Sequence, residues 1–199
     1  MTRLSENIKN GAQRMSDGGE HLQQPKETFN EGFLVENGVR VKSGPSADEL
    51  SARGYGVKDN DGVLLKFYEA LYLLDKGLLK VRNEEGNEVT FDHLLHFAEK
   101  TDENIWTKYI VYRDLRSRGY VVRGGFGLSV DFRVYERGEY GKDTAKYLIL
   151  TLQEGKNITL AKLAHVLKQC QNLKKELVLA VMSRRGEIVY YSVSQLNIR

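Results

Sequence analysis

Apolar residues recur at helical spacing in two separate stretches of this chain, and strand-like segments accompany both stretches. The first stretch runs over residues 64–74 and ends before Gly77, and the second runs over residues 104–118 and ends at Gly119. A helical period that alternates with short strand-like runs predicts an α+β fold. We expect a small N-terminal α/β domain, followed by a C-terminal domain in which helices flank a mixed central sheet.

The first half contains several segments with strand or helix signals. Residues 32–36 and 38–42 are strand-like, and Asn37-Gly38 between them is a typical hairpin turn. Residues 78–81 and 88–91 flank a polar turn, and Asp92 is then predicted to cap a helix. His93 and His96 lie three residues apart on that helix. They lack a third ligand nearby, so a surface role is favoured over a metal site.

The second half alternates in the same way. Strands are predicted at residues 120–123, 130–135 and 147–152, and Thr159 is predicted to cap a helix. Four residues of that helix are predicted to line one face: Leu160, Leu163, Ala164 and Leu167. Residues 177–181 and 188–193 are predicted to form a hairpin around Gly186.

These patterns divide the chain into three parts. Residues 1–31 are polar and without a clear period, which predicts a flexible or peripheral lead; residues 32–102 form the N-terminal domain and residues 103–199 the C-terminal domain. The chain starts without a secretory signal and contains no apolar run of roughly 18 residues. We therefore expect a cytoplasmic protein with no membrane segment. Its single cysteine, Cys170, fits a reducing compartment and a buried packing role.

Positive charge gathers in the last part of the chain. The whole chain carries a net charge of +3, whereas residues 156–199 hold eight basic and two acidic side chains, a local +6. The preceding residues therefore sum to −3. Such a distribution suits a domain that binds phosphate, and a solvated charged face is the alternative.

Three segments of the C-terminal half resemble one known family. They are residues 109–120 (YIVYRDLRSRGY), residues 131–138 (DFRVYERG), and the final strand pair with ELVLAV at 176–181 and IVYY at 188–191. Together they resemble the catalytic domain of the archaeal tRNA-intron endonucleases, and residues 65–77 resemble the N-terminal domain of the same family. The resemblance implies a nuclease-like C-terminal domain. It also implies metal-independent cleavage of precursor tRNA at bulge-helix-bulge sites, giving 2′,3′-cyclic phosphate and 5′-hydroxyl ends.

The family cleaves RNA with a tyrosine, a histidine and a lysine. By resemblance the tyrosine, a proposed general base, is Tyr135, and the lysine is Lys175, with Lys174 as the adjacent candidate. The position of the histidine is occupied by Thr144. A threonine hydroxyl does not titrate near neutral pH, so it cannot replace a histidine as the proton donor.

A second departure concerns RNA contacts. Lys168 stands where the family often has an arginine that stacks on a bulged base, and lysine stacks less well. Lys168 and Lys174 are the candidate RNA-binding residues. Members of the family assemble from four domain units, divided in some cases between catalytic and structural chains. The departures favour a structural subunit that works with other endonuclease subunits and needs no cofactor or metal.

Assembly features follow the family only in part. The family docks its units through an acidic turn between the last two strands, whereas residues 183–187 read Ser-Arg-Arg-Gly-Glu, with Glu187 the one acidic side chain. This puts docking through that turn in doubt. Residues 188–193 alternate in a way that allows the last strand to extend a sheet across an interface.

Three alternatives remain open from the sequence. In the first alternative the chain is catalytic and another residue donates the proton, with His165 as the first candidate. In the second alternative the chain is an unrelated Mg²⁺-dependent nuclease that uses Asp131, Glu154 and Lys156. The third alternative is a binding module without catalysis, in which tyrosines near the basic tail contact RNA bases. These tyrosines are Tyr135, Tyr140, Tyr147, Tyr190 and Tyr191.

Overall fold

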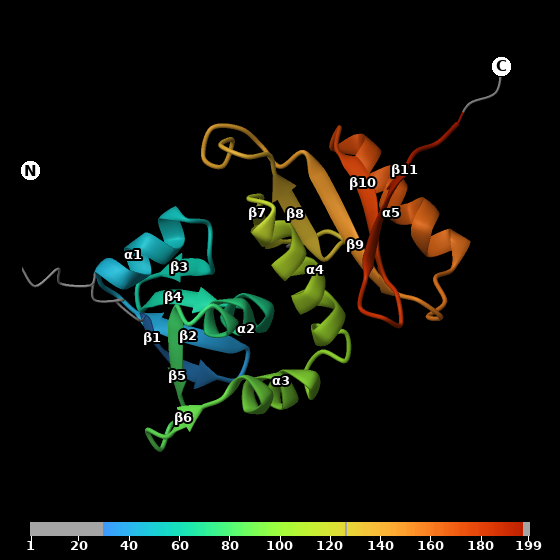
Figure 1. Cartoon of the computed structure of the whole chain (residues 1–199). Helices are drawn as coiled ribbons and strands as arrows, with labels where there is room; N and C mark the ends of the chain where they lie inside the picture. Colours follow the sequence, from blue (N-terminus) through green and yellow to red (C-terminus); the bar gives the residue numbers. More distant parts are fainter. Residues whose placement is uncertain (1–29, 126, 197–199) are drawn as a thin grey trace, which may run out of the picture.

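A computed structural model describes residues 30–125 and 127–196 of the chain. They form two units, each built on its own sheet, and Figure 1 shows the helix α4 between the N-terminal unit and the C-terminal sheet. The predicted α+β fold is confirmed, with a mixed sheet and flanking helices in the C-terminal unit. No helix among the described residues is long and apolar enough to span a membrane.

The N-terminal unit holds a six-stranded sheet in the order β3-β4-β2-β1-β5-β6. Its strands are β1 (Asn30–Val35), β2 (Gly38–Lys42), β3 (Val57–Asp59), β4 (Gly62–Leu65), β5 (Leu79–Arg82) and β6 (Glu88–Val89). Its helices are α1 (Pro45–Ala52), α2 (Phe67–Asp75) and α3 (Phe91–Glu99). The predicted hairpin around Asn37-Gly38 is confirmed, because β1 and β2 pair antiparallel and Val35 lies opposite Gly38.

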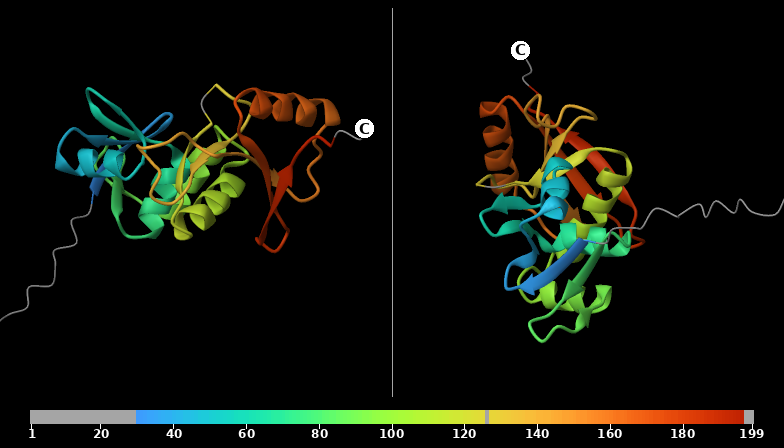
Figure 2. Two further views of the ribbon diagram at one scale, coloured as in Figure 1. Left: turned by 90° about the horizontal axis from the view of Figure 1, so that it is seen from above. Right: turned by 90° about the vertical axis from the view of Figure 1, so that its left-hand side faces the viewer.

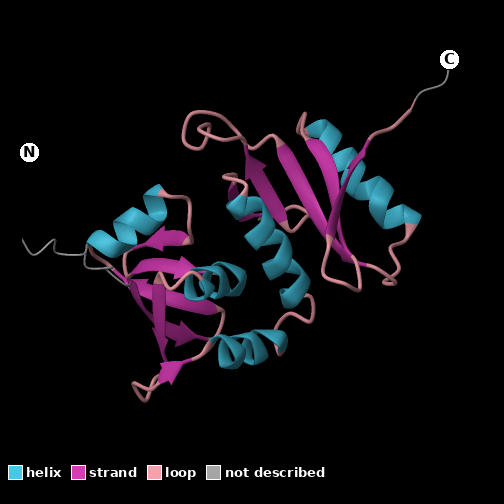
Figure 3. Cartoon of the chain, viewed as in Figure 1, coloured by secondary structure: helices cyan, strands magenta, loops and turns pink. Residues whose placement is uncertain are grey.

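The C-terminal unit holds a five-stranded mixed sheet in the order β11-β10-β9-β8-β7. Its strands are β7 (Val121–Gly124), β8 (Phe132–Tyr135), β9 (Tyr147–Gln153), β10 (Glu176–Met182) and β11 (Ile188–Val193), and its helices are α4 (Ile105–Ser117) and α5 (Leu160–Asn172). Only β9 and β10 pair in parallel. Parallel neighbours need a long crossover, which α5 provides. Helices α4 and α5 cover opposite faces of this sheet (Figure 3).

Several predicted boundaries were wrong. Leu64 and Leu65 belong to the strand β4, and α2 begins only at Phe67, where the Glu69 side chain accepts a hydrogen bond from the Lys66 amide at 2.8 Å. The helix α3 is capped by Thr90 and not by Asp92, since the Thr90 hydroxyl accepts from the His93 amide at 3.4 Å. The elements α1 and β3 were not predicted.

The helix α5 and the predicted N-terminal lead agree with the structure only in part. The predicted cap of α5 is confirmed, because Thr159 accepts from the Lys162 amide at 3.2 Å. Its buried face, however, is centred on Val166 and Cys170, while Leu160 is 84 % exposed. At the N-terminus, β1 already begins at Asn30, so the last two residues of the predicted lead lie in a strand. Residues 1–29 lie outside the described residues.

An aromatic cluster joins the two units. The ring of Tyr68 on α2 lies 5.1 Å from that of Tyr112 on α4 and 5.0 Å from that of Phe132 on β8, and Tyr72 lies 5.6 Å from Tyr112. Buried aromatic pairs of this kind contribute beyond the area they bury. The hydrophobic core therefore continues from the N-terminal sheet through α2 and α4 to the C-terminal sheet. The left view of Figure 2 shows α4 between the N-terminal unit and the C-terminal sheet.

Candidate functional site

Two of the predicted site residues, Thr144 and Lys175, are in direct contact. Each lies just before one of the two parallel strands, and the strands start level with each other, because Tyr147 of β9 lies opposite Glu176 of β10. The Lys175 ammonium donates a hydrogen bond to the Thr144 hydroxyl at 2.5 Å. The Thr144 hydroxyl in turn lies 3.3 Å from the Asp143 carboxylate, which also accepts from the Thr144 amide. The hydroxyl thus links a fixed ammonium to a carboxylate.

A small cavity of about 150 Å³ opens at these residues. Its lining comprises Glu136, Glu139, Asp143, Thr144, Lys146, Lys174 and Lys175. Three carboxylates and three ammonium groups balance, so the lining carries no net positive charge to attract a phosphate. One pair is already formed, since Lys146 donates to Glu136 at 2.7 Å. This hydrogen bond lowers the pKa of Glu136 and raises that of Lys146.

Tyr135 lies at the end of β8 and does not line this cavity. Its side chain is half-buried, and its ring packs edge-to-face on Tyr140 at a centroid distance of 5.1 Å. The structure therefore brings Thr144 and Lys175 together, whereas Tyr135 packs in an aromatic pair with Tyr140.

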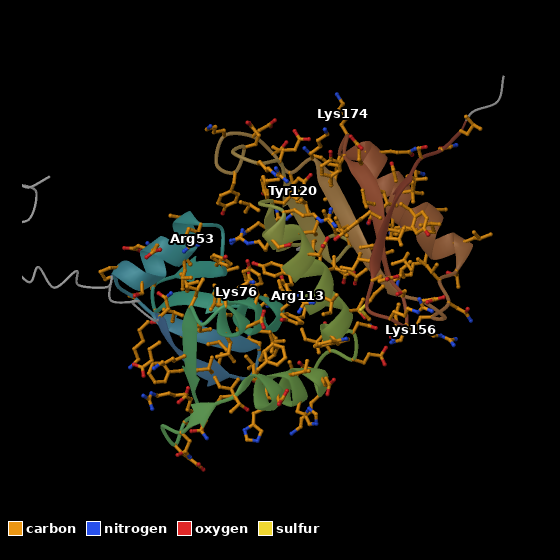
Figure 4. All side chains as sticks on the ribbon, viewed as in Figure 1. Arg53, Lys76, Arg113, Tyr120, Lys156 and Lys174 are labelled. Carbon is orange, nitrogen blue, oxygen red and sulfur yellow. The ribbon has the colours of Figure 1, made fainter. Side chains whose placement is uncertain are left out.

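Lys174 has an unusual backbone for a lysine. Its φ is 53°, and the other described residues with positive φ are all glycines. The cause is the end of α5: the Lys174 amide donates to Gln171 and the Lys175 amide to Cys170, a hydrogen-bonding pattern whose left-handed residue is usually glycine. The side chain is exposed and extends away from the ribbon at the upper end of the C-terminal unit (Figure 4).

The remaining candidates lie apart from the cavity. His165 and Lys168 are exposed on α5, and neither lines it. His93 and His96 are exposed on α3. Burial of Cys170 is confirmed, and desolvation raises the pKa of its thiol.

The residues of the Mg²⁺ alternative point to separate partners. Asp131 accepts from the Thr151 amide and hydroxyl at 2.7 and 2.8 Å and pairs with Lys108 at 3.2 Å. Glu154 accepts from the Arg184 amide at 3.1 Å, and Lys156 donates to Asn104 at 2.8 Å. No group of three or more histidine, cysteine, aspartate or glutamate side chains suited to a metal ion occurs among the described residues.

The tyrosines of the binding-module alternative are mostly engaged within the fold. The Tyr190 hydroxyl donates to Asp114 at 2.7 Å, and the Tyr147 hydroxyl donates to Glu136 at 3.3 Å. Tyr191 on the edge strand β11 is 53 % exposed, and Val189 on the same strand is 47 % exposed. An edge strand with exposed apolar side chains is a surface that can pair with another chain.

Sequence reasoning missed the acidic residues of the cavity. Glu136, Glu139 and Asp143 precede or flank Thr144 in the β8–β9 loop, and none was singled out. The available signal was the charge content of residues 136–146, which hold three acidic side chains. Charge alone does not show which of them face the lysines.

Comparison with known proteins agrees with the fold. The model of the tRNA intron endonuclease catalytic C-terminal domain matches residues 105–190, and the model of the tRNA intron endonuclease N-terminal domain matches residues 30–95. The tRNA-splicing endonuclease of Methanococcus vannielii is 29% identical over 177 residues, which cover 89% of this chain and 99% of that protein.

Two further relatives carry the same name. The tRNA-splicing endonuclease of Pyrococcus horikoshii is 35% identical over 73% of this chain and 83% of its own length. That of Methanothermobacter thermautotrophicus is 32% identical over 84% of this chain and 98% of its own length. Fold and matches together define a two-domain protein of the RNA endonuclease class. The chain belongs to the tRNA intron endonuclease family.

Proposed function

We propose that this chain is a subunit of a tRNA-splicing endonuclease that excises introns from precursor tRNA at bulge-helix-bulge sites, and that it is the structural partner of a catalytic chain. The family membership supports the substrate and the reaction. The observation that carries the structural role is the hydrogen bond from Lys175 to the Thr144 hydroxyl. The position expected to donate a proton instead holds an ammonium group in place.

The chemistry explains why this matters. Attack by the 2′-hydroxyl requires a group that removes its proton, a second group that protonates the leaving oxygen, and a cation that stabilises the phosphorane. Lys175 suits the last task, and Tyr135 is the family position for the first, although its ring packs on Tyr140 and does not line the cavity. Thr144 cannot supply the second proton, because its hydroxyl stays neutral near pH 7. His165 is not a substitute in this geometry, since it does not line the cavity.

RNA contact is proposed for the basic side chains around the end of α5. Lys168 and Lys174 are exposed there, and Lys175 lies at the cavity. Lys174 forms no ion pair or hydrogen bond through its side chain among the described residues, so its ammonium is free for a phosphate oxygen.

Lys174→Gly is expected to separate folding from RNA binding. Glycine relieves the left-handed backbone, which costs an ordinary residue about 1 kcal/mol, so the free energy of unfolding should rise by about that amount. Binding of precursor tRNA should weaken, and the dependence of log K on log salt should fall by about 1, because one phosphate contact is lost. Lys174→Arg is the control that keeps the charge. Unchanged binding by Lys174→Gly would exclude this contact.

The assembly is proposed to contain four units. This chain contributes one such unit, which consists of an N-terminal domain (residues 32–102) and a C-terminal domain (residues 103–199). The exposed edge of β11 supports pairing of the chain with another subunit. The turn at residues 183–187 carries Arg184 and Arg185, so a subunit that receives it must offer acidic rather than basic groups. We place the assembly in the cytoplasm.

Native mass spectrometry with a cleavage assay tests this proposal. Measured first for the chain alone and then with a co-purifying partner, the active complex should contain the partner and at least two copies of this chain. That complex should cleave a bulged precursor tRNA equally well with and without EDTA, because the proposed groups need no metal ion. Complete loss of cleavage in the chelator would contradict the mechanism.

A further inference from the structure

The loop from β8 to β9 carries Thr144 and rests on very few contacts. Within residues 137–144, all of which the structure describes, Tyr140 is the one residue that is not exposed. Two exposed residues of this stretch make further contacts: the Arg137 guanidinium lies 5.6 Å from the Tyr120 ring, and the Thr144 hydroxyl accepts a hydrogen bond from Lys175. Tyr140 is therefore the main anchor of the loop.

Tyr140 packs against the N-terminal unit at Gly54. Gly54 follows α1 with a φ of 77°, and a Cβ atom placed on it would lie 3.3 Å from Cε1 of Tyr140 and 2.5 Å from Cγ1 of Val121. Such close approach leaves no room for a side chain at residue 54. Figure 1 shows the loop reaching from the C-terminal sheet toward the N-terminal unit.

Tyr140 also reaches both halves of the candidate site. Its ring packs edge-to-face on Tyr135, and its backbone forms a β-bridge with Asp143. Asp143 in turn accepts hydrogen bonds from the amide and hydroxyl of Thr144, whose hydroxyl holds Lys175. Tyr140 thus connects Gly54 in the N-terminal unit to Tyr135 through its ring, and to Lys175 through its backbone, Asp143 and Thr144.

We propose that Tyr140 is a positioning residue through which the N-terminal unit holds the site in the C-terminal unit. The proposal rests on the proposed function for the meaning of the site, but the contacts themselves do not depend on it. It assigns the N-terminal unit a direct part in orienting Lys175. The ring, not the hydroxyl, carries this role, because ring atoms make the contacts with Gly54 and Tyr135.

The test measures how exposed the Lys175 amine is to acetylation, with Lys174 as the internal reference. Full-length chain is treated with limiting acetylating reagent, and the Lys175-to-Lys174 ratio is read by mass spectrometry. Tyr140→Leu, which removes the ring, should raise this ratio about fivefold, as expected when one hydrogen bond is lost. Tyr140→Phe, which keeps the ring, should leave it unchanged.

A second pair of variants probes the same connection from the N-terminal unit. Gly54→Ala should raise the ratio, because the new methyl group would lie 2.5 Å from Val121 and 3.3 Å from the Tyr140 ring, so that the packing of Tyr140 on this unit must shift. Gly77→Ala is the matched control: Gly77 follows α2 with a φ of 66° but has nothing within 4 Å of its Cβ position. It imposes similar backbone strain without touching the loop, so the ratio should stay at the wild-type value.

Three results would overturn the proposal. They are a wild-type ratio in Tyr140→Leu, an equal rise in Tyr140→Phe and Tyr140→Leu, and equal ratios in Gly54→Ala and Gly77→Ala. If Tyr140→Leu does not fold, the glycine pair decides. The measurement uses neither RNA nor a partner, so a failure of the proposed function, seen as absent tRNA cleavage by the complex, is read separately.

Discussion

Purified alone, this chain is expected to cleave a bulged precursor tRNA at least about 10²-fold more slowly than a complex that contains a catalytic partner. A positioned acid or base contributes about 10²–10⁴ in rate, and Thr144 supplies neither. The measurement is a single-turnover cleavage assay with equal concentrations of the chain and the complex. Cleavage by the unmodified chain at the full rate would contradict the role assigned to Thr144 and make His165 the next candidate.

The variant Thr144→His sharpens this prediction. We expect it to leave the isolated chain slow, because Tyr135 does not line the cavity and three carboxylates surround Lys175 there. A gain of about 10²–10⁴, removed again by Tyr135→Phe, would show instead that Tyr135 and Lys175 form a site that lacks one member.

Glu69→Ala is expected to destabilise the fold by about 2–5 kcal/mol. Glu69 is 2 % exposed, and its carboxylate accepts from the Gly56 amide at 3.0 Å and the Lys66 amide at 2.8 Å. Removal of the carboxylate leaves both donors without this partner, and a buried unpaired donor costs about 1–3 kcal/mol. Denaturant unfolding measures the loss.

The control for Glu69 is another glutamate on a helix. Glu49→Ala removes an exposed pair with Arg53 at 3.3 Å and should change the free energy of unfolding by less than about 1 kcal/mol. Equal effects of the two variants would contradict a buried role for Glu69.

Glu69 also gives the pH dependence a sign. Burial raises the pKa of its carboxyl group in the folded chain. Folding therefore favours the protonated form of Glu69. Its contribution to the free energy of unfolding is fully present below the pKa of Glu69 in the unfolded chain and is lost as the pH rises through its pKa in the folded chain. Glu69→Gln should remove that part of the pH dependence of unfolding.

Local signals in the sequence predicted a large part of the fold. The period of residues 104–118 gave α4, and Thr159 was correctly identified as the cap of α5. The boundary at Leu64 and Leu65 failed because their spacing fits a helix, while pairing with β2 places them in a strand. Whether such a segment forms a strand or a helix depends on pairing partners that are distant in the sequence, and the local spacing of apolar residues carries no information about those partners.

The site was predictable to a smaller extent. Resemblance suggested Thr144 and Lys175, and their contact depends on the level starts of two parallel strands. The anchoring role of Tyr140 depends on Gly54, which lies 86 positions earlier in the chain. No spacing rule connects such residues, because the contact exists only after the two units have packed together.

The most direct test of the structural role is the cleavage rate of the assembled complex with Tyr135→Phe in this chain alone. The account predicts a rate equal to that of the unmodified complex, because the partner supplies the catalytic groups. The same change at the corresponding tyrosine of the partner should abolish cleavage. A fall of about 10²–10⁴ on changing Tyr135 in this chain would contradict the account, since that is the contribution of a catalytic base.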